Sequence, residues 1–220
     1  MKGDVHVNLL TVFFNNWKIA TKSEIELEKY KNTETDITNN NLVQVFGTGP
    51  VDNEAIARNN CLNMLNNAKE YAYITTPYLV LDGEMIVSLK LAARSGVDVR
   101  IVMPGVPDKK IVYCLSRSYY QDLIDAGVKI YEYKPGFVHA KMIATDVATF
   151  VGTINFDFRS LYLHFEDGII MYSDPTTGTV KEDISEMIED STPITSEVVK
   201  SRNFWYKFFG KILKLFAPLM

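Results

Sequence analysis

Hydrophobic and polar residues follow one another along this chain in blocks that predict alternating strands and helices. Short apolar runs of strand length end in glycine or proline, and longer segments with apolar residues three or four positions apart come between them. Strands are predicted at residues 42–46, 71–75, 98–103, 129–133, 148–151 and 167–172, and helices at 54–69, 83–95 and 111–126. Asp52 or Asn53 is expected to cap the first of these helices, and Gly96 and Gly127 to end the other two.

This alternation predicts an α/β fold. Strand–helix–strand connections through short, glycine-marked turns favour a parallel sheet with helices on both faces. The two strands on either side of Asp146 are close enough in sequence to pair antiparallel. We therefore expect a mixed, mainly parallel sheet flanked by helices on both faces.

Both ends of the chain are predicted to be helical. Residues 4–30 carry apolar side chains at helical spacing, and a polar loop is expected at 31–41. Near the other end, an acidic helix over 174–191 is expected to stop before Pro193. A last helix is predicted from Ser196 onward.

The last helix combines a basic stripe with a wide apolar face. At 100° per residue the stripe consists of Lys200, Asn203, Lys207, Lys211 and Lys214. The remaining positions are aromatic and aliphatic: Phe204, Trp205, Phe208, Phe209, Ile212, Leu213, Leu215 and Phe216. This pattern is typical of a helix that lies in a membrane interface. It also suits a helix docked on the protein core, and the two roles are compatible.

Composition limits the classes to which the protein can belong. Of the 220 residues, 47% are hydrophobic and 23% are charged, which is typical of a globular domain. The net charge of −4 argues against a nucleic-acid partner. Cys61 and Cys114 lack the spacing of metal ligands and are expected to be reduced and buried. No apolar run approaches the roughly 18 residues of a membrane span, so no transmembrane helix is predicted.

The strongest chemical signal lies between Phe137 and Tyr172. His139 and Lys141 are predicted to share a strand, where alternate side chains point to the same side. An imidazole beside an ammonium suits a phosphate, because lysine binds the non-bridging oxygens while histidine attacks phosphorus or transfers a proton. Asp146 follows in a turn.

The next strand ends in a second group of candidate residues. Gly152 lets the backbone approach a ligand closely, and Asn155 offers an amide to the same phosphate oxygens. Thr153 adds a hydroxyl between them. We expect no metal, because His139, Asp146 and Glu166 do not form a recognisable metal-binding pattern.

The order His-x-Lys, Asp, Gly-Thr-x-Asn resembles the HKD motif of the phospholipase D superfamily. The longer string GTINFDFRSLYLHFE resembles the second HKD region of bacterial cardiolipin synthases. The resemblance extends to ITTPYLV, AARSGVDVRIVMPGVPDK, SRSYYQDLIDAGVKIYEY and the C-terminal LFAPLM. Such enzymes carry two HKD motifs, whereas this chain has one. The chain therefore resembles the C-terminal half of a cardiolipin synthase.

The resemblance implies phosphatidyl transfer between two phosphatidylglycerol molecules, giving cardiolipin and glycerol through a phosphohistidine without a cofactor. His139 would act as general acid and base opposite a second histidine, Asp146 would fix the local turn, and Glu166 would orient a catalytic imidazole. The phosphate would be bound by Lys141, Gly152, Thr153 and Asn155.

The resemblance also suggests a domain organisation and partners. Residues 1–41 would link to a missing first repeat, 42–195 would form the HKD domain, and 196–220 the amphipathic helix. Because one motif supplies one imidazole, the partner would be the missing first-HKD half or a second copy of this chain. The protein would bind phosphatidylglycerol at the anionic surface of a bacterial membrane, peripherally on the cytoplasmic side.

Two other functions remain open at this point. One is a homodimeric single-HKD phosphodiesterase, acting as a phospholipase or as a nuclease, although the acidic balance disfavours nucleic acid. The other is a catalytically silent domain that binds a lipid surface through its last helix.

Overall fold

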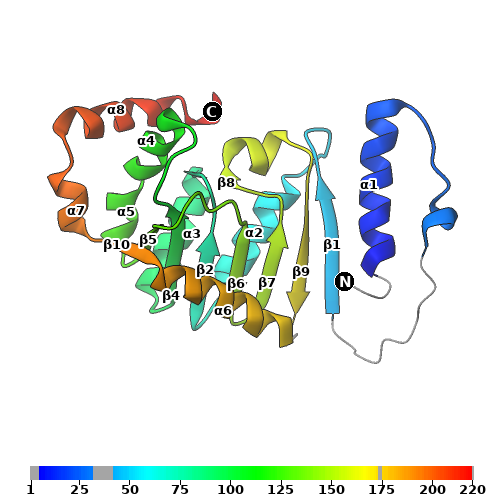
Figure 1. Ribbon diagram of the computed structural model, residues 1–220, viewed down its shortest axis with the longest axis horizontal. Helices are drawn as coiled ribbons and strands as arrows, with labels where there is room; N and C mark the ends of the chain where they lie inside the picture. Colours follow the sequence, from blue (N-terminus) through cyan, green and yellow to red (C-terminus); the bar gives the residue numbers. More distant parts are fainter. Residues whose placement is uncertain (1–4, 32–41, 173–174, 220) are drawn as a thin grey trace.

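The computed structural model describes residues 5–31, 42–172 and 175–219 (Figure 1). Its centre is an eight-stranded sheet with the order β1-β9-β7-β6-β2-β4-β5-β10. These strands are β1 (Leu42–Thr48), β2 (Tyr71–Thr75), β4 (Asp98–Pro104), β5 (Lys129–Tyr133), β6 (Met142–Thr145), β7 (Ala148–Gly152), β9 (Glu166–Tyr172) and β10 (Ser191–Ile194). A small second sheet pairs β3 (Leu79–Val80) with β8 (Phe156–Asp157) in parallel.

Helices cover both faces of the large sheet. Side chains of α2 (Ile56–Asn67), α3 (Gly83–Arg94), α4 (Lys110–Ser118) and α5 (Tyr120–Ile124) pack into the larger hydrophobic core on one face. On the other face, Val180 and Ile184 of α6 (Pro175–Glu189) pack into a smaller core. The prediction of an α/β fold with helices on both faces of a mixed sheet is confirmed.

Parallel pairs are nevertheless the minority in this sheet, contrary to the prediction of a mainly parallel one. Only β2–β4 and β4–β5 are parallel among the neighbouring pairs of the described sheet. A parallel pair needs a crossover connection, and α3, α4 and α5 supply these for β2, β4 and β5. The segments between β6, β7 and β9 contain no such crossover helix, so these strands pair antiparallel.

Several predicted helix boundaries are wrong. Helix α1 (Val5–Thr21) ends nine residues before the predicted Tyr30. Lys22, which follows it, has φ 57°, a left-handed conformation that stops the helix, and a separate 3₁₀ turn, η1, spans Leu27–Tyr30. Asp52 does not cap α2, because its carboxylate accepts the N–H of Gly49 at 2.7 Å. The predicted loop at 31–41 lies outside the described residues except for Lys31.

The helix expected over 111–126 is divided at Tyr119 into α4 and α5, and Gly127 closes it with φ 101°. Gly96 ends α3 in the same way, as predicted, with φ 94°. After α6, Pro193 lies inside the strand β10, which the sequence did not predict. This strand is at the edge of the sheet, where the missing N–H of proline breaks no ladder bond.

The last predicted helix is broken into α7 (Ser196–Ser201) and α8 (Phe204–Leu215), followed by a 3₁₀ turn, η3, at Ala217–Leu219. Asn203 begins α8, since its side chain accepts the N–H of Trp205 at 2.8 Å. The helix docks closely on α4 at Gly210, where a Cβ would lie 3.0 Å from that of Ser118. The docked face is narrow, with Leu213 buried on it.

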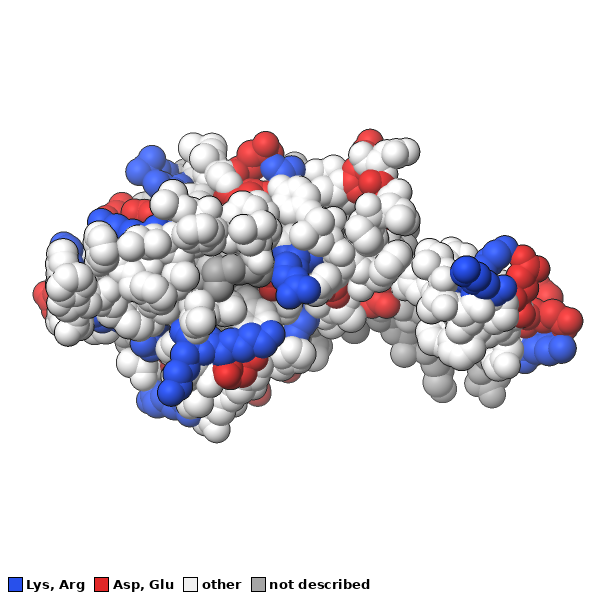
Figure 2. Space-filling view, turned by 90° about the horizontal axis from the view of Figure 1, so that it is seen from above, with Lys and Arg blue, Asp and Glu red and all other residues white. Residues whose placement is uncertain are grey.

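Most of the apolar side chains of α8 remain exposed. They include Phe204, Trp205, Phe208, Phe209, Ile212, Leu215 and Phe216. Figure 2 looks onto this side of the molecule, and the surface along α8 is broad and largely uncharged. The two roles predicted for the helix, docking and membrane contact, are therefore geometrically compatible. No helix within the described ranges is long and apolar enough to cross a membrane.

Candidate active site

Most of the candidate residues lie at one end of the strands of the large sheet, the end opposite Asp146. Strand β2 ends there and β6 begins, because Thr75 pairs with Met142. Strand β7 ends and β9 begins at the same level, where Gly152 pairs with Gly168. This is the upper edge in Figure 1, and the loops that leave it carry His139, Lys141 and Asn155.

His139 and Lys141 lie in the loop before β6, so the prediction that both lie on a strand is wrong. Strand β6 begins only at Met142. The Lys141 side chain folds back, and its Nζ donates to the carbonyl oxygen of His139 at 2.7 Å. The imidazole of His139 is exposed, and its centroid lies 5.8 Å from that of the Phe137 ring. This arrangement presents the imidazole to solvent beside a fixed ammonium.

The environment of Lys141 combines burial with two nearby acids. Partial burial lowers the pKa of Lys141, while the negative charges of Glu166 and Asp157 act in the opposite direction. Asp157 is buried, and the side chain of Glu166 is 10% exposed. The Oγ of Ser160 donates to Glu166 at 2.8 Å and thereby fixes this carboxylate. The ammonium therefore has carboxylates on the protein side and remains available to an anion from solvent.

In the segment from Gly152 to Asn155, Gly152 and Thr153 hold neighbouring strands together, and Asn155 is the candidate phosphate ligand. The Gly152 N–H donates to the carbonyl oxygen of Lys141 at 3.3 Å, which links the two halves of the motif. A Cβ at Gly152 would lie 2.5 Å from the carbonyl oxygen of Asp167, so the close approach here is to β9. The Thr153 hydroxyl donates to that same oxygen at 3.2 Å and accepts the Asp167 N–H at 3.0 Å. Thr153 thus holds the strand end together.

Asn155 differs from its neighbours, because part of its side chain is unsatisfied. Its Oδ1 is buried and has no hydrogen-bond partner among the described residues. An unpaired buried acceptor calls for a donor, such as a hydroxyl group of a ligand. A phosphate oxygen would be bound by the Nδ2 group of the same side chain, which is a donor.

The sequence Thr76-Pro77-Tyr78 follows β2 and lies against this segment. The Thr76 hydroxyl accepts the N–H of Phe156 at 3.1 Å and donates to the carbonyl oxygen of Tyr78 at 2.8 Å. The ring of Tyr78 lies 6.3 Å from that of Phe137, and its hydroxyl donates to Asp108. The half-buried Tyr78 and the Phe137 ring form an aromatic wall that the sequence analysis did not predict.

Asp146 lies at the opposite end of β6 from Lys141, in the turn between β6 and β7. Its carboxylate accepts backbone N–H groups of Lys69 at 2.9 Å, Glu70 at 3.1 Å and Tyr71 at 3.4 Å. Burial raises the pKa of Asp146, but these hydrogen bonds outweigh burial and lower it overall. In this geometry Asp146 fixes the start of β2 to the β6–β7 turn.

We expect Asp146→Ala to destabilise the fold by about 1 kcal/mol, the usual effect of removing a carboxylate that caps backbone N–H groups. Because the folded-state pKa is lowered, the contribution is complete above the unfolded-state value of about 3.9 and is lost as pH falls through the folded-state pKa. Urea unfolding of both proteins at pH 7 and pH 3 measures this. A difference in stability that grew on acidification would contradict the assignment.

Glu166 contacts a different imidazole from the one that the sequence suggested as catalytic. The Nδ1 of His164, which is exposed, lies 3.5 Å from Glu166 Oε1. The expected orientation of a catalytic imidazole by Glu166 stays a prediction. No cluster of His, Cys, Asp and Glu suited to a metal ion occurs in the ranges that the structure describes.

Comparison with known proteins decides the family. The profile described as "Cardiolipin synthase, PLD-like domain" matches residues 61–188, more than half of the chain. The chain belongs to this family of phospholipase D-like domains. It is 37% identical over its whole length to a cardiolipin synthase of Clostridium perfringens and 34% identical to that of Halalkalibacterium halodurans. An uncharacterized protein of Streptococcus mutans is 40% identical.

The matched region is a part of each relative. The chain covers 48% of the Clostridium perfringens and Streptococcus mutans proteins and 44% of the Halalkalibacterium halodurans protein. It therefore spans about half the length of the curated relatives that it matches.

Solved structures support the fold. The phospholipase D family member Nuc of Salmonella typhimurium superposes with a TM-score of 0.60 at 20% identity, over 71% of this chain and 99% of Nuc. Phosphatidylserine synthase of Haemophilus influenzae gives a TM-score of 0.63 at 14% identity, over 80% of this chain and 45% of that one. At these identities the likeness shows the phospholipase D-like fold alone.

Proposed function

We propose that this chain supplies one HKD half of a cardiolipin synthase, which joins two phosphatidylglycerol molecules and releases glycerol. The observation that carries the proposal is the meeting of His139, Lys141 and Asn155 at one sheet edge, in a chain of the cardiolipin synthase family. An imidazole attacks phosphorus or transfers a proton, and an ammonium and the N–H groups of an amide bind the phosphate oxygens, so these are the groups that reaction at a phosphodiester requires.

In the proposed reaction an imidazole attacks phosphorus, and the bond from phosphorus to the glycerol oxygen breaks. The opposing imidazole donates a proton to that oxygen, and glycerol leaves. A terminal hydroxyl of the second phosphatidylglycerol then gives its proton to the same imidazole and attacks phosphorus, which breaks the P–N bond. His139 takes the role of acid and base, and the histidine of the other HKD motif is the nucleophile.

The Lys141 ammonium and the Asn155 amide would hold the non-bridging oxygens in both steps. Charge on these oxygens increases as the fifth bond to phosphorus forms, so fixed donors stabilise the transition state more than the substrate. Partial burial lowers the pKa of Lys141, and the negative charges of Glu166 and Asp157 oppose this effect. Asp146 and Thr153 would act only through the backbone that they hold.

The second imidazole would come from another HKD motif. Relatives of about twice this length favour a first-motif half as its source. A homodimer with two facing His139 residues is the second candidate. One observation favours it: this chain covers 99% of Nuc, so the chain of that phospholipase D family member is about one such domain long, as this chain is. Such a dimer would act as a phosphodiesterase on lipids or nucleic acids.

Incubation of the purified chain with phosphatidylglycerol vesicles tests the proposal, with cardiolipin and glycerol as the measured products. We expect cardiolipin from the chain when it is joined behind the first half of the Clostridium perfringens enzyme. Cardiolipin from the chain alone, with a rate that rises with the square of its concentration, would indicate the homodimer. If neither preparation forms cardiolipin while both are folded, the proposal is wrong, and cleavage of phosphatidylglycerol or DNA without transfer would support the phosphodiesterase.

A further inference from the structure

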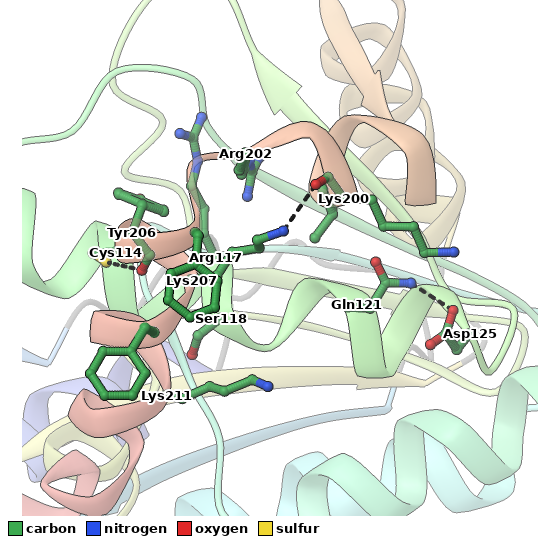
Figure 3. Close-up of a pocket in the computed structure, with 13 residues that line it drawn as sticks. Cys114, Arg117, Ser118, Gln121, Asp125, Lys200, Arg202, Tyr206, Lys207 and Lys211 are labelled. Atoms are coloured by element: carbon green, nitrogen blue, oxygen red, sulfur yellow. Dashed lines mark hydrogen bonds between the residues drawn. The ribbon is translucent and has the colours of Figure 1, made fainter.

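A basic cavity lies away from the HKD residues, between the C-terminal helices and α4–α5 (Figure 3). Its volume is about 420 Å³. Figure 3 shows side chains of α7 and α8 on one side of this space, opposite Ser118 and Gln121 on the other. The break between α7 and α8 creates the cavity, because a continuous helix would not fold back over α4.

The charges around this cavity are strongly one-sided. Five lining residues are cationic, namely Arg117, Lys200, Arg202, Lys207 and Lys211, and one, Asp125, is anionic. Since the whole chain has a net charge of −4, this concentration of positive charge is local. A concave site lined by charges of one sign focuses the potential and attracts counter-ions.

Several of these cations have unused capacity. Lys200 and Lys211 have no ion pair or side-chain hydrogen bond in the described part of the chain. Nη1 of Arg202 is buried without a hydrogen-bond partner there, although Nη2 of the same side chain lies 3.5 Å from Glu132. Buried donors are normally paired, so this guanidinium group is suited to a missing hydrogen-bond acceptor. Lys207 is partly used, since its Nζ donates to the carbonyl oxygen of Lys200 at 2.9 Å.

We propose that this cavity binds the phosphate of an anionic phospholipid headgroup and so fixes the protein on the membrane. Two structural features favour a lipid as the source of the phosphate. The lining also contains apolar side chains, Val199, Phe204 and Phe208, which suit a glycerol backbone and the first acyl carbons. The cavity opens beside the exposed aromatic face of α8, where Trp205 is 71% exposed, and such a face inserts among lipid headgroups.

This site goes beyond the proposed function, because it would hold a lipid that is not consumed. Helix α8 and the loops that carry the HKD residues lie on the same, upper side of the molecule in Figure 1. A headgroup in the cavity would therefore turn the HKD residues toward the bilayer that contains the substrate. Neither the motif nor its spacing in the sequence indicates such a site.

The test measures binding of short-chain phosphatidylglycerol, below its micelle concentration, through the fluorescence of Trp205. Trp17→Phe removes the emission of the other tryptophan. We expect saturable binding that Lys200→Gln/Lys211→Gln weakens about 30-fold, since each basic residue at an anionic surface contributes about 1 kcal/mol. Both lysines are exposed, so the thermal midpoint should not change.

Lys69→Gln/Lys90→Gln is the charge-matched control, because it removes two positive charges away from the cavity, one on α3 (Lys90) and one two residues after the end of α2 (Lys69). An equal loss of affinity for phosphatidylglycerol in this control would overturn the proposal and indicate general attraction between charges instead. Inorganic phosphate that binds as tightly as the lipid would also overturn it, because the ligand would then be a free anion.

Vesicle binding separates this proposal from the catalytic one. Binding to vesicles that contain phosphatidylglycerol, and not to those of phosphatidylcholine alone, should depend on Lys200 and Lys211 and should weaken as salt rises. His139→Ala should bind as the unmutated protein does. Lysine-dependent binding without any lipid turnover would support the cavity and count against the proposed function, whereas turnover with lysine-independent binding would do the reverse.

Discussion

Replacing His139 by Asn is expected to reduce cardiolipin formation by roughly 10²–10⁴-fold in any assembly of this chain that is active, because in the proposed reaction the imidazole transfers the proton in both steps. Asparagine keeps the size and polarity of the side chain but cannot exchange a proton near neutral pH. His139 is exposed and makes no side-chain hydrogen bond in the described structure, so the thermal midpoint should not change. The rate of cardiolipin release measures the effect.

Two other histidines serve as controls for this result. His6 lies on α1, away from the HKD loops, and His6→Asn should leave the rate unchanged. His164 lies 3.5 Å from Glu166, and the resemblance to the family implies that Asn is acceptable there. Activity that survived His139→Asn but not His164→Asn would assign the reacting imidazole to His164 and contradict the proposed site.

The site was predictable from the sequence because its residues are close in the chain. His139, Lys141 and Asn155 lie within one short segment, and the turn at Asp146 brings the two halves together. Periodicity could not predict where strand β6 begins. His139 and Lys141 alternate as strand residues do, but the Lys141 side chain turns back to the carbonyl oxygen of His139. Alternation over three residues does not distinguish a strand from an extended loop.

Contacts between distant residues were beyond the sequence. The hydrogen bond from the Phe156 N–H to the Thr76 hydroxyl joins residues 80 positions apart, and no local sequence pattern predicts it. The predicted majority of parallel pairs was also wrong. Strands that are covered by helices on both faces, such as the antiparallel β6, are buried along their whole length as parallel strands are, so only the connections distinguish the two. Pro193 was taken as the end of a helix, but the edge position that makes it acceptable in β10 is a tertiary property.

The second large effect is expected for Glu132→Gln, which should destabilise the fold by about 3 kcal/mol. Glu132 lies on β5 and is 7% exposed. It accepts a hydrogen bond from Nε of Arg117 at 2.8 Å, and Nη2 of Arg202 lies 3.5 Å from it. Burial alone would lower the pKa of Arg117, and the bonds to Glu132 raise it instead. Glutamine would leave two largely buried guanidinium groups without a counter-charge.

Urea unfolding measures this loss, and Glu182→Gln on the exposed side of α6 is the control, with an expected change below about 0.5 kcal/mol. Adding Arg117→Met should recover part of the stability, because it removes one of the two unpaired charges.

The Glu132→Gln substitution also affects the basic cavity, since Arg117 and Arg202 both line it. Glu132→Gln should therefore lower stability while it raises affinity for an anionic headgroup. General misfolding would lower both, so opposite signs would show that Glu132 restrains the charge of this cavity.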